Sequence, residues 1–153
     1  MSEDTHDGGC LCGQLRYRTH GPTTVTGACH CRYCQIRAGS AFGVLAYFDE
    51  DKVEVLAGSS CDYRFTSESG YGWHNQFCPQ CGVTTFMRLE VFPDMVGIAA
   101  GTFDPPTFWF ELKNEVFMRS KAHFVGEISA ENHDDTFFSH QPKTSDDPRL
   151  TGI

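Results

Sequence analysis

The sequence predicts a mainly β domain held together by metal-binding cysteines. Short apolar segments alternate with Gly, Asp, Asn and Pro along most of the 153 residues, which is typical of strands joined by turns. Helix signals are weak and amount to about one turn at 33–38. Seven of the eight cysteines fall into three tight groups, a spacing typical of metal ligands. These observations favour one domain of many short strands.

The expected strands follow one another from residue 14 to residue 118. They lie at 14–20, 42–48, 53–56, 63–65, 84–88, 96–100, 108–112 and 116–118. Between the last two, Lys113, Asn114 and Glu115 are expected to form a hairpin turn.

The C-terminal part of the chain differs in composition. From about residue 129 it is rich in Glu, Asn, Asp, Ser and Pro, with Phe137, Phe138 and Leu150 as its apolar anchors. We expect residues 1–128 to form the zinc-binding domain. Residues 129–153 are expected to be a polar tail that either wraps the domain through those anchors or is disordered.

Charge and hydropathy exclude several classes of partner. The formal net charge is −8, and an acidic surface argues against nucleic acid, whose phosphates need a basic footprint. No apolar stretch approaches the roughly 20 residues that span a bilayer. The first residues show no basic segment followed by an apolar run, so we expect no secretory signal. We therefore expect a cytoplasmic protein with reduced cysteines, and the sequence leaves open its assembly with further copies.

The cysteine groups divide into a closed and an open metal site. Two are pairs, Cys10-Leu11-Cys12 and Cys78-Pro79-Gln80-Cys81, and one is the triplet Cys29-His30-Cys31-Arg32-Tyr33-Cys34. A structural zinc takes four protein ligands, whereas a reactive zinc usually takes three. Only the two pairs add up to four without splitting a group. We expect one structural zinc on the pairs and one open zinc on the triplet.

Both cysteine sites have alternative interpretations. Eight cysteines could form disulfides, but cysteines one residue apart are awkward to bridge and suit a shared ion. Cys61 could close the open site, although alternation places it beside Tyr63 and Phe65, where a lone cysteine is more often a small buried hydrophobe. His30 and His74 are further candidates for the fourth ligand. In an extended segment His30 would point away from the triplet.

Several motifs in order resemble one family. Residues 8–17 (GGCLCGQLRY), 29–34 with 38–42, 65–70 with 77–82, 101–106 and 120–122 are similar to successive segments of the glutathione-dependent formaldehyde-activating enzyme and centromere protein V family. The resemblance implies a β-tent fold, with two small antiparallel sheet layers pinned by the four-cysteine zinc. It also implies a second zinc on Cys29, Cys31 and Cys34, and a carbon–sulfur lyase that adds a thiol such as glutathione to formaldehyde or another aldehyde.

The donor set agrees with thiol chemistry. Three thiolates leave a zinc centre with a net charge of about −1, which weakens it as a Lewis acid for hydrolysis, while a soft thiol is a natural fourth ligand. The alternative is a non-catalytic module, stabilised by zinc, that binds glutathione or a protein. The polar candidates at the site are Arg32, Asp104 and His123 for catalysis, and Arg37, Arg119 and Lys121 for contacts with substrate carboxylates.

Overall fold

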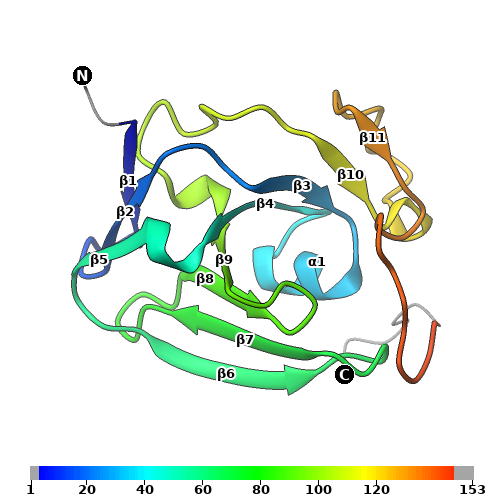
Figure 1. Ribbon diagram of the computed structural model, residues 1–153, viewed down its shortest axis with the longest axis horizontal. Helices are drawn as coiled ribbons and strands as arrows, with labels where there is room; N and C mark the ends of the chain where they lie inside the picture. Colours follow the sequence, from blue (N-terminus) through cyan, green and yellow to red (C-terminus); the bar gives the residue numbers. More distant parts are fainter. Residues whose placement is uncertain (1–3, 147–153) are drawn as a thin grey trace.

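The structure is a computed structural model that describes residues 4–146. Within that range it contains two β-sheets, a single α-helix and three short 3₁₀ helices (Figure 1). The elements are β1 (Thr5–Gly9), β2 (Arg16–His20), β3 (Val25–Cys29), α1 (Arg32–Ala38), β4 (Gly43–Asp49), η1 (Glu50–Lys52), β5 (Val53–Ala57), β6 (Cys61–Thr66), β7 (Gly72–Phe77), β8 (Thr84–Leu89), β9 (Met95–Ala99), η2 (Ala100–Thr102), β10 (Asn114–Val116), η3 (Met118–Ser120) and β11 (Asn132–His133). The expected mainly β fold is confirmed.

The larger sheet has eight strands in the order β11-β10-β3-β4-β9-β8-β7-β6. Its strands are antiparallel except at one edge, where β10 runs parallel to both β3 and β11. The hairpin expected at 113–115 was wrong. Thr26 of β3 explains this: its Oγ1 donates to Glu111 O (2.7 Å) and accepts from Lys113 N (2.9 Å), so this segment pairs with a distant strand.

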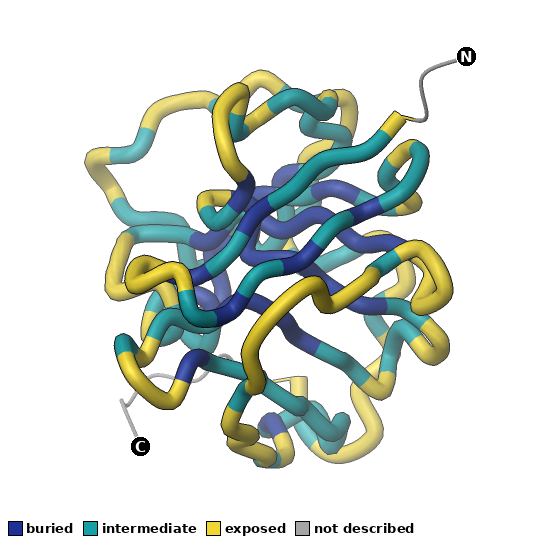
Figure 2. Tube along the Cα trace, turned by 90° about the vertical axis from the view of Figure 1, so that its left-hand side faces the viewer, coloured by how far each residue is buried: buried dark blue, intermediate teal, exposed yellow. Residues whose placement is uncertain are grey.

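A second sheet of three strands, β1-β2-β5, covers one side of the larger one, and the main core lies at the contact. Tyr17, Phe48 and Ile98 are fully buried there, and the hydroxyl group of Tyr17 bonds Thr102 Oγ1 (2.8 Å). Residues 108–112, expected as a strand, form irregular chain instead, from which Phe110 packs against this core. Figure 2 shows the buried positions in the crossing strands, with exposed loops around them.

Helix α1 follows β3 directly and is as short as its weak sequence signal predicts. Its N-cap is Cys31, whose Sγ accepts a hydrogen bond from the backbone amide of Cys34 (3.4 Å). Gly39 ends the helix in the left-handed region at φ 61°, a conformation that costs glycine little.

The chain beyond residue 129 packs on the larger sheet up to the last described residue. β11 lies beside β10, and Phe137 contacts the rings of Phe92 and Phe117. In Figure 1 this orange segment runs down the side of the molecule next to β10. Leu150, the third expected anchor, lies outside the described residues. None of the described helices is long and apolar enough to cross a membrane.

Candidate functional site

The two cysteine pairs meet where the two sheets join. Cys10 and Cys12 follow β1 of the smaller sheet, whereas Cys78 and Cys81 lie between β7 and β8 of the larger one. All four Sγ atoms lie within 4.8 Å of one another, with Cys10–Cys12 at 3.6 Å and Cys12–Cys78 at 3.7 Å. Tetrahedral zinc with bonds of about 2.3 Å requires sulfurs about 3.8 Å apart. The set therefore fits a structural zinc that ties one sheet to the other.

Both pairs are shaped by the same kind of turn. A glycine follows the second cysteine of each pair, Gly13 at φ 78° and Gly82 at φ 77°. Their amides donate to the carbonyl groups of the first cysteines, Gly13 to Cys10 (3.1 Å) and Gly82 to Cys78 (2.8 Å). These tight turns aim both sulfurs of each pair in one direction. Only glycine adopts such φ values readily, so the glycines are part of the site.

The triplet forms a second, separate set at the end of β3 and the start of α1. The sulfurs of Cys29, Cys31 and Cys34 lie within 4.8 Å of one another, and all three residues are buried. Cys34 accepts hydrogen bonds from the other two thiols and lies near the Arg37 guanidinium, so its pKa is well below the ordinary value. The same hydrogen bonds keep the pKa of Cys29 well above its ordinary value. Three converging soft donors, one of them poised as a thiolate, fit a zinc ion.

Among the described residues, no His, Asp, Glu or further Cys joins the triplet as a fourth ligand. Cys61 lies on the edge strand β6 and is exposed, so the expectation that it is a buried hydrophobe was wrong. His74 lies on β7 beside Asp62 (Nε2–Oδ1 3.2 Å) and belongs to neither cysteine set.

His30 points away from the triplet, as expected, into a buried charge network. Its Nε2 lies 2.9 Å from a carboxylate oxygen of Glu115 on β10, and both side chains are almost completely buried. The same carboxylate binds Lys121 Nζ (2.6 Å) and His133 Nδ1 (2.7 Å). Burial opposes ionisation of Glu115, but these donors outweigh it and hold its pKa at about 2. The network fastens the loop that carries the metal ligands to β10.

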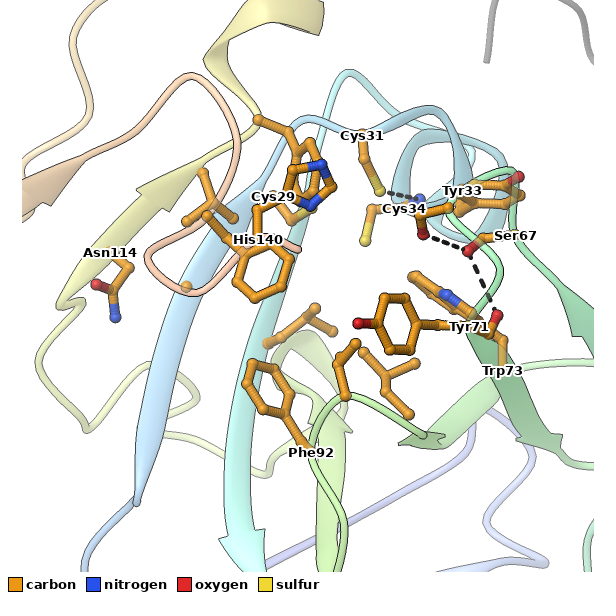
Figure 3. A pocket seen from close by; sticks show the side chains of 18 of the residues that line it. Cys29, Cys31, Tyr33, Cys34, Ser67, Tyr71, Trp73, Phe92, Asn114 and His140 are labelled. Atoms are coloured by element: carbon orange, nitrogen blue, oxygen red, sulfur yellow. Dashed lines mark hydrogen bonds between the residues drawn. The ribbon is translucent and has the colours of Figure 1, made fainter. Parts of the chain in front are cut away.

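A cavity of about 150 Å³ opens beside the triplet, and all three cysteines line it (Figure 3). Tyr71, Trp73 and Phe92 face them across the space. The remaining aromatic walls are Tyr33, Tyr47, Phe117, Phe137 and Phe138. The polar side chains in the lining are Thr26, Arg32, Ser67, Glu68, Ser69, Asn114, Arg119, Ser120, His140 and Ser145.

Two of the six predicted polar candidates reach this cavity. Arg32 lines it, and so does Arg119, whose guanidinium bonds Asp146. Arg37 approaches the sulfur of Cys34 but lines a hollow on the other side of α1, next to Gly43.

The structure places the other three candidates elsewhere. Lys121 is committed to the buried Glu115. Asp104 forms an ion pair with Arg16 near the smaller sheet, and His123 is exposed beside Phe124; neither lines the cavity at the triplet.

Sequence reasoning missed a histidine in the cavity wall. His140 lies in the C-terminal strap, which we define as residues 134–146, and its Nε2 is 2.6 Å from Asp146 Oδ1. Its ring packs between Phe117 and Phe137. The signal available in the sequence was the pair of phenylalanines in an otherwise polar tail. This pair indicated that the strap packs against the domain, but it did not indicate which cavity the strap covers.

Comparisons with known proteins agree with this architecture. Residues 5–120 match the sequence profile of the family described as glutathione-dependent formaldehyde-activating enzyme. The fold is similar to the crystal structure of a Rhodobacter sphaeroides protein from structural genomics, with a TM-score of 0.51 and 19% identity over 69% of this chain and 96% of that chain. No functionally curated protein shows significant similarity. Because the profile covers most of the chain and both cysteine sets assemble, this chain belongs to the glutathione-dependent formaldehyde-activating enzyme family.

Proposed function

We propose that this protein is a zinc-dependent enzyme of the carbon–sulfur lyase type, acting in the cytoplasm, that makes or breaks the adduct of a small thiol with an aldehyde. Glutathione with formaldehyde, or a related pair, is the substrate class. The observation that carries the proposal is the triplet of cysteines, which opens on a cavity and has no fourth protein ligand among residues 4–146. Family membership supports the same chemistry.

The two cysteine sets would have different tasks. Zinc on Cys29, Cys31 and Cys34 would offer its remaining position to a sulfur ligand and favour the thiolate form of that ligand. The reaction forms one S–C bond, breaks the π bond of the carbonyl group and transfers the thiol proton to the carbonyl oxygen. The four-cysteine set would hold the two sheets in place, because four sulfur ligands complete the coordination of a tetrahedral ion.

The residues around the cavity can assist in distinct ways. The aromatic walls exclude water from the reacting groups. We assign Arg32, which lies at the start of α1 and lines the cavity, to bind a carboxylate of the thiol. We assign His140, which lines the cavity and whose Nε2 contacts Asp146, to hold the proton between its removal from sulfur and its delivery to oxygen.

The test compares wild type with Cys34→Ser, and with Cys61→Ser as a matched control outside both cysteine sets. We expect two zinc ions per chain in wild type and in the control, and one in Cys34→Ser. NMR exchange spectroscopy of a glutathione–formaldehyde mixture should show adduct exchange above the uncatalysed rate with wild type and Cys61→Ser, but not with Cys34→Ser. Titration calorimetry measures glutathione binding in parallel.

Each other outcome points to a different function. Glutathione binding without faster exchange would indicate a thiol carrier. Neither binding nor exchange would indicate a zinc-stabilised interaction module.

A further inference from the structure

One wall of the cavity is an aromatic cluster. Phe92 is its centre, with its ring centroid 5.0 Å from that of Tyr47 and 6.2 Å from those of Phe137 and Phe138. The apolar lining continues through Val25, Leu45, Trp73, Leu89, Val91, Val116 and Phe117. Such a surface favours an apolar ligand group, because water in contact with it gains few hydrogen bonds.

The size of the cavity indicates the size of that group. Its volume is about 150 Å³, and an apolar cavity of about that volume in another protein binds benzene. Formaldehyde has one carbon atom and would leave most of this space in contact with water. A ring or a branched chain of four to six carbons would fill it.

The thiol half of the adduct is poorly suited to this wall. Glutathione carries two carboxylates and an ammonium group, which lose free energy when they are placed against apolar side chains without partners. Figure 3 shows Ser67 and Tyr33 on the Cys34 side of the cavity, with Phe92 across the space. Arg32 belongs to the same helix as Cys34. A polar thiol would therefore lie along α1, which leaves the aromatic wall to the aldehyde.

Part of the aromatic wall comes from beyond the family profile, which ends at residue 120. Phe137 and Phe138 belong to the C-terminal strap, which is fastened at several points. The backbone amide of Lys143 donates to Ser69 O (2.7 Å), and the hydroxyl group of Tyr71 donates to Gln141 O (2.6 Å). The strap is thus a fixed wall of this cavity, supplied by a segment that the family profile does not include.

We propose that this cavity binds a benzene-sized apolar group, and that in the reaction proposed above this group belongs to the aldehyde. The substrate class is then an aromatic or branched aliphatic aldehyde rather than formaldehyde alone. The second part rests on the proposed function, whereas the first concerns binding only.

The first experiment measures binding without chemistry. Benzyl alcohol, which has neither a thiol nor a carbonyl group, is titrated into the zinc-loaded protein and followed by ligand-observed NMR. Phe138→Ala removes a ring that is 57% exposed and stacked on Phe92, so the variant should fold normally. Phe124→Ala is the matched control, since Phe124 is 72% exposed and does not line the cavity. We expect Phe138→Ala to weaken binding by about five-fold, the scale of one lost aromatic contact, and Phe124→Ala to change nothing.

The second experiment compares aldehydes. With glutathione as the thiol, benzaldehyde and 3-methylbutanal should exchange faster than formaldehyde relative to their uncatalysed rates, and Phe138→Ala should reduce that preference. Failure of benzyl alcohol to bind, or binding that is equal in wild type and Phe138→Ala, would overturn the inference. Catalysis restricted to formaldehyde would overturn it too and leave the proposed function standing. Binding that depends on Phe138 without turnover of any aldehyde would support the apolar site and refute the proposed function.

Discussion

Glu115 offers the sharpest test of how the ligand loop is held. Its carboxylate is almost fully buried and is shared by His30, Lys121 and His133. Glu115→Gln keeps the shape of the side chain but removes its charge. The ammonium group of Lys121, whose Nζ lies 2.6 Å from this carboxylate in a mostly buried position, then loses its counter-charge.

The expected magnitude follows from the pKa of Glu115. Its contacts lower the pKa from 4.5 to about 2, and each pKa unit corresponds to about 1.4 kcal/mol. Because Gln retains some of the hydrogen bonds, we expect Glu115→Gln to lower the free energy of unfolding at pH 7 by about 2–3 kcal/mol. The folded-state pKa is depressed, so this contribution is complete above about pH 4.5 and is lost as the pH falls towards 2.

Urea unfolding of wild type and Glu115→Gln, with zinc bound and at several pH values, measures this difference directly. Zinc content is measured at each pH, and the two proteins are compared only where they hold the same number of ions. Glu111→Gln is the control, because Glu111 is largely exposed in its contact with Lys113 and its loss should not be measurable. A variant within 0.5 kcal/mol of wild type at pH 7, or a difference that does not narrow below pH 4.5, would refute the view that this carboxylate clamps the loop.

Three further predictions concern the fold and its metal sites. Cys78→Ser should lose one zinc ion and unfold, because its cysteine set joins the two sheets. Cys34→Ser should also lose one zinc ion but keep the circular dichroism spectrum of the folded protein. If both variants unfold, the two cysteine sets do not have separate roles. Gly82→Ala should lower the free energy of unfolding by about 1 kcal/mol, because a φ of 77° is strained for any residue with a side chain. Gly101→Ala, where an added Cβ meets open space, should leave the free energy of unfolding unchanged in the same urea assay. Phe48→Ala should lower the free energy of unfolding by about 3–5 kcal/mol, because the ring is fully buried. A decrease below 1 kcal/mol would show that Phe48 is not part of the main core.

The strands that the sequence predicted are those with a clear apolar signature. β4 and β8 carry several buried side chains each and were anticipated within about one residue. β1, β3 and β7 were missed, because their sequences are rich in Gly, Thr, His and Asn and only their neighbours in the sheet make them strands. β10 was mistaken for a turn for the same reason, since its partners β3 and β11 are distant in the sequence.

By itself the sequence determined the mainly β class, the two metal-binding sets and their division into four and three. Ligand number and spacing are local properties, and a cysteine pair followed by glycine defines a turn that aims two sulfurs at one point. The tertiary structure alone decided what lies around the triplet. Glu115 reaches His30 across 85 positions, and the strap brings Phe138 and His140 to a cavity whose other walls come from distant strands. Such contacts depend on how the strands are ordered in the sheet and on which segment covers its face, and local periodicity carries neither.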